Sequence, residues 1–205
     1  MEGYESFAGA PYLKPHPIRV EATREKLSKF TKPIVGISWR SSLTTYSRNE
    51  HYLDIDMLMP IFEIDGIQFV NLQYDDCQAE LSYVNDRLPG RLIDLEGVDQ
   101  YNDFESVAAY MANMDLIISP VTTVTELAGA LGCPTWLLSN SSELHWRVRP
   151  DNGRDVWHNS IKHIEGDVLG DKASLVEKLR ISLIAWLDER ETSLGGQSAR
   201  KSVDT

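Results

Sequence analysis

The sequence predicts a single Rossmann-like α/β domain, doubly wound around a mainly parallel sheet. Short apolar runs rich in Val, Ile, Leu and Phe alternate with helix-sized polar or amphipathic stretches along most of the chain. Such spacing is typical of parallel strands that are joined by right-handed helical crossovers. The length of 205 residues also suits one domain with a well-buried core.

Five apolar runs predict strands, and a sixth run is compatible with one. The first five span 33–38, 67–72, 91–95, 115–119 and 133–138, and the sixth spans 160–166. Helices are predicted over 18–30, 54–64, 78–86, 103–114, 123–132 and 171–190. Pro60 is expected near the start of the second helix or at a kink in it, and Gly132 is expected to end the fifth.

The chain is expected to divide into three parts. Residues 1–31 form an irregular lead-in and a helix, and residues 32–190 form the α/β domain. Residues 191–205 are polar, contain a Gly-Gly pair and are expected to be a disordered tail.

Composition and charge argue against several classes of protein. The net charge of −11 disfavours nucleic-acid binding, which needs a basic surface to displace counterions. No apolar run approaches the ~20 residues of a membrane helix, and no signal peptide is visible, so a cytoplasmic location is expected. Cys77 and Cys133 provide neither a disulfide framework nor a metal site, and no metal or other cofactor is predicted.

Hydroxyl-rich segments follow two strands that are expected to be neighbours in the sheet. With the common strand order 3-2-1-4-5, the order reverses between the first and fourth strands, and ligands bind at such a reversal. The segments SWRSSLTTYSRNEH (38–51) and SPVTTVTE (119–126) follow these two strands. We therefore expect a binding site where the two segments meet.

The second of these segments turns from a strand into a helix. Backbone N–H groups and the positive end of the helix make such a turn an anion site, to which Thr122 and Thr123 add hydroxyl groups. Thr123 and Glu126 also fit the S/T-x-x-E capping box, in which Glu126 would bond the amide of Thr123. For Glu126, a capping role and a ligand contact are both left open.

Other candidates lie on the loops around the same rim. Arg40 can pair with a phosphate through two hydrogen bonds, or it can be an ordinary exposed arginine. Gln73 and Tyr74 end the second strand, where Gln73 can reach a ligand or cap the loop. Trp146 can stack on a base or sugar, or pin its loop to the core. It lies in a basic stretch, 145–154, for which a solvated loop is the alternative.

Several well-known motifs are absent. Neither G-x-G-x-x-G nor G-x-x-x-x-G-K-[ST] occurs, so the sequence lacks the usual marks of dinucleotide binding and of nucleoside triphosphate hydrolysis. No Ser/His/Asp order, metal-ligand cluster or pair of carboxylates stands out, so no catalytic residue is assigned.

The succession of VGISWRSS, FVNLQY, a D-F-x-x-x-A-A helix, DLIIS and TTVTELAGALGCPTWLL, with a later tryptophan loop, resembles a known family. It is similar to the C-terminal half of glycosyltransferases with two facing Rossmann domains (the GT-B architecture). The closest likeness is to glycosyltransferase domains linked to tetratricopeptide (TPR) repeats, which are related to heptosyltransferases and more distantly to O-linked N-acetylglucosamine transferase. The likeness covers roughly residues 32–165, and ELAGALGCPTW is its most specific part.

In this family the C-terminal domain holds the nucleotide-sugar donor, a substrate rather than a cofactor. The resemblance implies that Thr122, Thr123, Val124 and Arg40 bind the donor diphosphate. It also implies that nucleotide and sugar are contacted by residues of the neighbouring loops, namely Ser38, Trp39, Ser41, Gln73, Tyr74, Glu126 and Trp146.

The chain departs from the family pattern in two ways. Many relatives resemble S-V-D-T-x-x-x-H in the turn where this chain has Val121 and Glu126 at the Asp and His positions, which leaves the donor open. A complete enzyme also has an N-terminal Rossmann domain for the acceptor, whereas here only a lead-in and the helix 18–30, which resembles the connector between the halves, precede the first strand.

We therefore expect a donor-binding domain, inactive by itself, that needs a Rossmann or TPR region of the same protein. A homodimer through the exposed cleft face is a further expectation. The alternative is a non-catalytic interaction domain that kept the fold.

Overall fold

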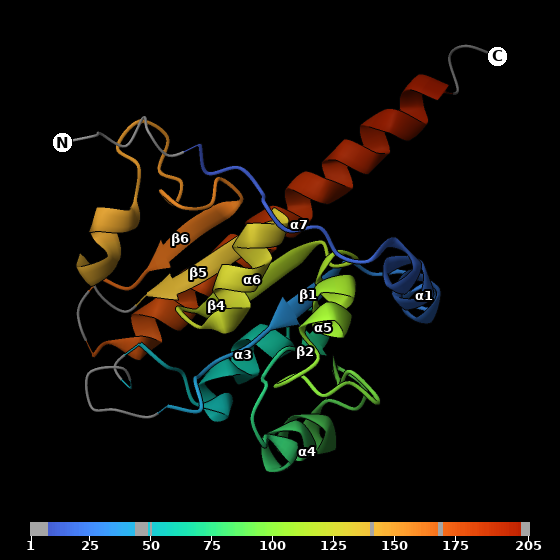
Figure 1. Ribbon diagram of the computed structural model, residues 1–205, viewed down its shortest axis with the longest axis horizontal. Coiled ribbons are helices and arrows are strands. Elements are labelled where there is room, and N and C mark those ends of the chain that lie inside the picture. Colours follow the sequence, from blue (N-terminus) through green and yellow to red (C-terminus); the bar gives the residue numbers. More distant parts are fainter. Residues whose placement is uncertain (1–7, 44–48, 50, 140–141, 168–169, 202–205) are drawn as a thin grey trace.

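The computed structural model describes residues 8–43, 49, 51–139, 142–167 and 170–201. Within these ranges one parallel sheet has the strand order β3-β2-β1-β4-β5-β6 (Figure 1). The strands are β1 (Ile34–Ile37), β2 (Gln68–Asn71), β3 (Leu92–Ile93), β4 (Leu116–Pro120), β5 (Thr135–Ser139) and β6 (Ile161–Glu165). The predicted fold class and the reversal of strand order between β1 and β4 are confirmed.

Helices cover both faces of the sheet (Figure 1). Buried side chains of α3 (Met59–Phe62), α4 (Gln78–Arg87) and α7 (Lys172–Lys201) form one core. Those of α1 (Pro17–Leu27), α5 (Phe104–Met111) and α6 (Thr123–Leu131) form the core on the other face. The 3₁₀ helices η2 (Ile55–Leu58) and η3 (Ser142–Arg147) lie in the loops after β1 and β5.

Burial of the strands follows from this two-sided cover. Every residue of β1, β2, β4 and β5 is buried, because a parallel sheet with helices on both faces has no solvent side. Strand β6 lies at the edge, and only its Ile161 and Ile164 are buried. The continuous apolar runs of the sequence are therefore the central strands.

The helix predicted over 54–64 is divided into η2 and α3. Pro60 is the second residue of α3, where its missing N–H costs no intrahelical hydrogen bond. Of the two positions that the sequence left open for Pro60, the structure shows the one at a helix start.

Helix α7 extends to Lys201, beyond the predicted end at Arg190, so residues 191–201 continue a helix instead of forming the expected irregular tail (Figure 1). Leu175, Leu179 and Leu183 anchor its first half in the core. A helix nucleated by such packing extends at low cost, because each added residue gains a backbone hydrogen bond. Residues 202–205 of the predicted tail lie outside the described residues.

The lead-in crosses the C-terminal end of α6. The amides of Tyr12 and Leu13 donate to the carbonyl of Ala130, at 2.9 and 3.0 Å. Gly132 ends α6 with a φ of 77°, as predicted, and a Cβ there would meet Pro11 Cγ at 2.4 Å. Position 132 therefore requires glycine for two reasons: glycine adopts the positive φ that ends α6, and it has no side chain to collide with Pro11 of the lead-in. Within the described ranges, no helix has the length and apolar character needed to cross a bilayer.

Candidate functional site

The carboxyl ends of β1 and β4 meet through their hydroxyl side chains. Ser38 Oγ lies 2.8 Å from Ser119 Oγ, and Ser119 Oγ lies 3.1 Å from Thr122 Oγ1. Thr125 donates to the carbonyl of Pro120 at 2.6 Å. The two hydroxyl-rich segments therefore adjoin, but Ser38, Ser119 and Thr125 are fully buried and bond to protein. Residues 44–48 and 50 of the first segment lie outside the described residues.

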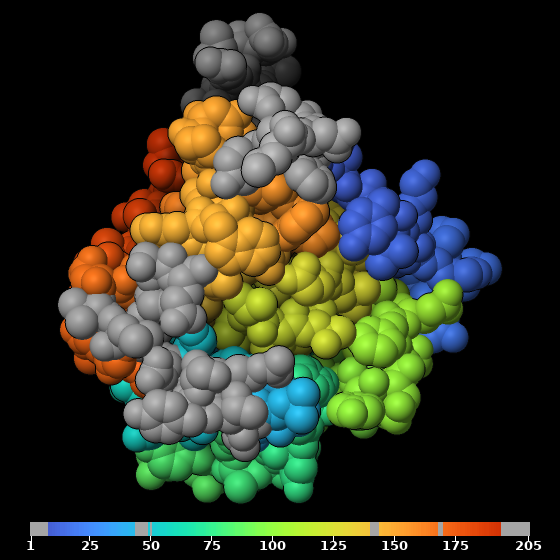
Figure 2. All heavy atoms as spheres, turned by 60° about the vertical axis from the view of Figure 1, so that its left-hand side comes forward, coloured from blue at the N-terminus to red at the C-terminus, as the bar shows by residue number. Residues whose placement is uncertain are grey.

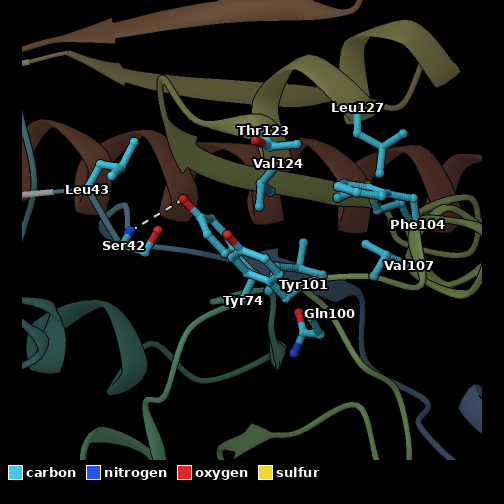
Figure 3. Close-up of a pocket in the computed structure, with 12 residues that line it drawn as sticks. Ser42, Leu43, Tyr74, Gln100, Tyr101, Phe104, Val107, Thr123, Val124 and Leu127 are labelled. Atoms are coloured by element: carbon cyan, nitrogen blue, oxygen red, sulfur yellow. Dashed lines mark hydrogen bonds between the residues drawn. The ribbon is translucent and has the colours of Figure 1, made fainter.

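A cleft of about 360 Å³ opens beside this junction (Figure 3). It lies between the loops after β1 and β2, the loop before α5, α5 itself and the first turns of α6. The side chains that line it are apolar, aromatic or neutral polar: Ser42, Leu43, Leu72, Tyr74, Gln100, Tyr101, Phe104, Val107, Met111, Thr123, Val124 and Leu127. Tyr74, Thr123 and Val124 are among the residues predicted for the site.

The N-terminus of α6 borders this cleft. Thr122 is the N-cap residue, and its Oγ1 accepts a hydrogen bond from the Val124 amide at 3.3 Å. Thr123, the first helical residue, is exposed, and Val124 is buried. The capping box of Thr123 and Glu126, one of the two alternatives, is therefore not formed, because the hydroxyl that caps the helix belongs to Thr122.

Arg40 is held by two carboxylates. Its guanidinium forms ion pairs with Asp75 and Glu80, the latter at 2.5 Å, and its side chain is 23% exposed. The hydrogen bond to Glu80, with the charges of Glu80 and Asp75, raises the pKa of Arg40 against the opposing effect of burial. Contrary to the prediction of a phosphate ligand, Arg40 is neutralised by protein groups.

Gln73 and Trp39 are structural. The side-chain oxygen of Gln73 accepts from the amides of Trp39 and Arg40, at 3.1 and 3.2 Å, and its nitrogen donates to the Arg40 carbonyl and to Asp75. Trp39 is fully buried, and its indole donates to Glu80 at 2.8 Å. The alternative of a loop-capping amide therefore describes Gln73, and neither side chain is placed to contact a ligand.

Ser41 and Tyr74 connect the loops after β1 and β2. The hydroxyl groups of Ser41 and Tyr74 lie 2.9 Å apart, and the Ser42 amide donates to the Tyr74 hydroxyl at 3.4 Å (Figure 3). Ser41 is buried, whereas the Tyr74 ring lines the cleft. Tyr101 is 60% exposed at the mouth of the cleft, 6.1 Å from the Tyr74 ring. It was not predicted, because the loop before α5 carries no distinctive motif.

Glu126 belongs to a buried charge network that the sequence did not reveal. Arg147 donates to Glu126 at 2.8 Å and to both oxygens of Asp155, at 2.9 and 3.3 Å. His158 lies 3.2 Å from the other oxygen of Glu126, and His163 lies 2.9 Å from Asp155. Glu126 therefore neither caps α6, as one alternative proposed, nor lies free for a ligand, although its side chain is 43% exposed.

The pKa values of the network follow from these contacts. The hydrogen bond with His158 lowers the pKa of Glu126, and Arg147 lowers it further, against the effect of burial. Burial acts to raise the pKa of Asp155, but hydrogen bonds from His163 and Arg147 outweigh it and lower that pKa. Both carboxylates are therefore charged at neutral pH. Arg147 comes from the basic stretch 145–154 and is only 5% exposed, so this part of the stretch belongs to the buried network and not to a solvated loop.

Trp146 is 56% exposed, next to Arg147 in η3. It does not pin its loop to the core. Its ring lies edge-on to Trp157, with centroids 6.5 Å apart and planes at 75°. Among the described residues, no group of three or more His, Cys, Asp or Glu side chains could hold a metal ion.

Comparison with known proteins identifies the type of fold. No family model matches the chain. It is 33% identical over 132 residues to Protein FlbA of Caulobacter vibrioides, an alignment that covers 64% of this chain and 22% of that protein. The chain thus spans about a fifth of the curated relative that it matches.

Two solved glycosyltransferases overlay on most of the chain. The glycosyl transferase family 9 protein from Veillonella parvula DSM 2008 gives a TM-score of 0.61 at 12% identity, over 88% of this chain and 55% of that protein. The E. coli ADP-heptose lps heptosyltransferase II gives 0.58 at 16% identity, over 88% and 54%. This chain therefore shares the fold of these two glycosyltransferases and spans about half of each solved chain.

Proposed function

We propose that this domain binds the nucleoside diphosphate sugar donor of a glycosyltransferase. One observation carries the proposal. The N-terminus of α6 borders an aromatic-lined cleft of about 360 Å³ beside the reversal of strand order between β1 and β4. Parallel α/β sheets bind ligands at this place, and the free amides and positive end of a helix favour a phosphate.

The cleft suits an anion despite the acidity of the chain. The net charge is −11, yet the described residues that line the cleft carry no charged side chain. A diphosphate at the first turn of α6 would therefore meet the Thr123 amide and the positive end of the helix without an adjacent carboxylate in the lining, whereas the Val124 amide already donates to Thr122. Because Arg40 is neutralised by Asp75 and Glu80, we assign the phosphate role to the helix end and to the amide and hydroxyl of Thr123.

The aromatic side chains of the cleft suit a nucleobase. The ring of Tyr74, from the loop after β2, and the rings of Tyr101 and Phe104, from the start of α5 and the loop before it, surround one opening, with Leu72 and Met111 also in its lining (Figure 3). A planar base gains from stacking on such rings, and a largely apolar pocket with a few polar groups is typical of nucleotide sites. Gln100 offers an amide for recognition of a base edge.

A second domain is part of the proposal. Because the chain corresponds to about half of the solved glycosyltransferases, we propose that acceptor binding and catalysis use another Rossmann or TPR region. The link to TPR proteins and the distant relation to O-linked N-acetylglucosamine transferase stay predictions from the resemblance. A cytoplasmic location would give the domain access to nucleotide sugars.

A second candidate, from a different class, is an interaction domain that kept the fold and lost the donor. The neutralised Arg40 favours it, because no cationic side chain is left among the described residues of the cleft. Val121 and Glu126, at positions where many relatives resemble Asp and His, also favour it.

Titration calorimetry with ADP, UDP and GDP at low salt distinguishes the donor-binding domain from the interaction domain. The informative variant is Thr123→Glu, because a carboxylate in the first turn favours the helix but repels a diphosphate. Unit charges roughly 5 Å apart repel by about 3 kcal/mol at an effective dielectric constant of about 20, so affinity should fall about a hundredfold. Thr192→Glu adds the same charge on α7 and should leave the affinity unchanged. No binding of any nucleotide to the wild-type protein would refute donor binding and favour the interaction domain.

A further inference from the structure

A short hairpin lies between η3 and β6. Val148 and Asp155 form an antiparallel bridge, and the Arg149 amide donates to the Arg154 carbonyl at 2.7 Å. The connecting residues 150–153 are Pro, Asp, Asn and Gly, which are the residue types that tight turns favour. All of them are exposed, and the segment that follows β5 (orange) forms part of the molecular surface in Figure 2. Water therefore has free access to the tip of this hairpin.

The tip contains an asparagine that is followed directly by a glycine. The backbone nitrogen of the residue after an asparagine can attack the side-chain amide carbon, and a side chain on that next residue hinders the attack. Gly153 has no side chain and a φ of 68°. Apart from its neighbours in the chain, no heavy atom of the described residues lies within 4 Å of the position that a Cβ of Gly153 would occupy. The attack on Asn152 is therefore sterically open.

The hydrogen bonds of the tip favour the same reaction. Asn152 Oδ1 accepts from the Arg154 amide at 2.9 Å, which polarises the side-chain carbonyl as a donor in an oxyanion hole does. The Gly153 amide donates to the Arg149 carbonyl at 2.9 Å. That N–H bond lies in the plane of the peptide group, so it leaves open the face from which the nitrogen attacks. The fold therefore holds an activated carbonyl next to its nucleophile.

We propose that Asn152 is a site of spontaneous deamidation in the folded protein. The backbone nitrogen of Gly153 forms a bond to Cγ of Asn152, which closes a five-membered succinimide ring. The bond between Cγ and Nδ2 breaks, and the side-chain nitrogen leaves as ammonia with the hydrogen of the Gly153 amide. Water then opens the ring at either carbonyl. The products are aspartate, with the normal backbone, and isoaspartate, whose main chain runs through the former side chain.

The two products affect the hairpin differently. Aspartate keeps the backbone and an oxygen that can accept from the Arg154 amide. Isoaspartate adds one methylene group to the main chain of the turn, and the pairing of a hairpin depends on the length of its connection. The pairing of Arg149 with Arg154 comes next along the hairpin, followed by Asp155, whose carboxylate pairs with Arg147 at 2.9 Å. Isoaspartate should therefore weaken the buried network, whereas aspartate should not.

The experiment follows the folded protein during incubation at mildly alkaline pH. Peptide mass spectrometry detects the gain of about one dalton that accompanies deamidation, and labelling by protein isoaspartyl methyltransferase detects isoaspartate. Asn102 is the control within the same chain, because it is also exposed but is followed by Asp103, which has a side chain. Asn152 should react at least about tenfold faster than Asn102, a difference of about 1.4 kcal/mol in activation free energy.

Two variants separate the reaction from its consequence. Asn152→Gln keeps an amide but would need a larger ring, so the mass gain and the methylation at this position should disappear. Asn152→Asp reproduces the product with the normal backbone, and its urea midpoint should equal that of the unaged wild type. The aged wild type, which contains isoaspartate, should have a lower midpoint than either.

The rate in the folded protein decides the proposal. The folded chain should react at least as fast as the chain unfolded in urea, because the fold activates the carbonyl. A much slower reaction in the folded chain would show that the hairpin protects Asn152, and equal rates at Asn152 and Asn102 would remove the site altogether. Isoaspartate at position 152 without a change of the urea midpoint would overturn the predicted effect on the network.

Discussion

Replacement of Arg147 with methionine should destabilise the domain strongly. The variant keeps the apolar stem but removes three side-chain hydrogen bonds, two to Asp155 and one to Glu126. Asp155 is fully buried and would keep only His163 and backbone amides as partners. Breaking a buried ion pair costs about 3–5 kcal/mol, and because Asp155 keeps these partners we expect about 3 kcal/mol. That is a large fraction of the 5–15 kcal/mol by which typical domains are stable.

Urea unfolding followed by circular dichroism measures this loss. The double variant Arg147→Met/Asp155→Asn removes the stranded charge while Asn can still accept from the amides, so it should recover part of the stability. Arg180→Met is the matched control, because Arg180 pairs with Glu177 on the exposed surface of α7 at 2.9 Å, and the loss of stability there should be much smaller. A loss in Arg147→Met as small as in the control, or no recovery in the double variant, would refute the reasoning.

The pH dependence of stability gives a second test of the same network. The pKa of folded Asp155 is lowered, chiefly because hydrogen bonds from His163 and Arg147 outweigh the opposing effect of burial. The stabilisation is therefore present above the unfolded pKa of about 3.9 and is lost as the pH falls through the folded value. Wild-type stability should fall between about pH 5 and pH 2, and the double variant should show a smaller fall.

Two further predictions concern the site loops and the thiols. Arg40→Met should lower the free energy of unfolding by about 2 kcal/mol, since Glu80 and Asp75 lose their partner. The same variant should leave nucleotide affinity unchanged in the calorimetry. A large loss of affinity without a loss of stability would show instead that Arg40 binds the phosphate. Burial raises the pKa of Cys77 and of Cys133 to about 11. Neither thiol should therefore react with Ellman's reagent at pH 8 until urea unfolds the chain. Rapid reaction of the folded protein would contradict the burial of these thiols.

Local sequence patterns were enough to predict most of the fold. The five apolar runs and the sixth run became the six strands of the described sheet, and four of the apolar runs are the central strands, because strands covered on both faces tolerate continuous apolar sequence. Gly132 was expected to end a helix and does so with a positive φ. The end of α7 was not predictable in this way, since the packing of Leu175, Leu179 and Leu183 supplies an anchor that propensity does not show.

The candidate site was predictable in outline only. The sequence by itself determined that the segments after β1 and β4 adjoin, because strand order in a doubly wound sheet follows general rules. Tertiary structure alone decided which side chains are available. Arg40 is engaged by carboxylates from the loop after β2 and from α4, Gln73 is used within the loops, and Glu126 pairs with an arginine 21 residues away. A charged or polar group in a low-dielectric surrounding bonds to the nearest partner, and only the folded chain determines which partner that is.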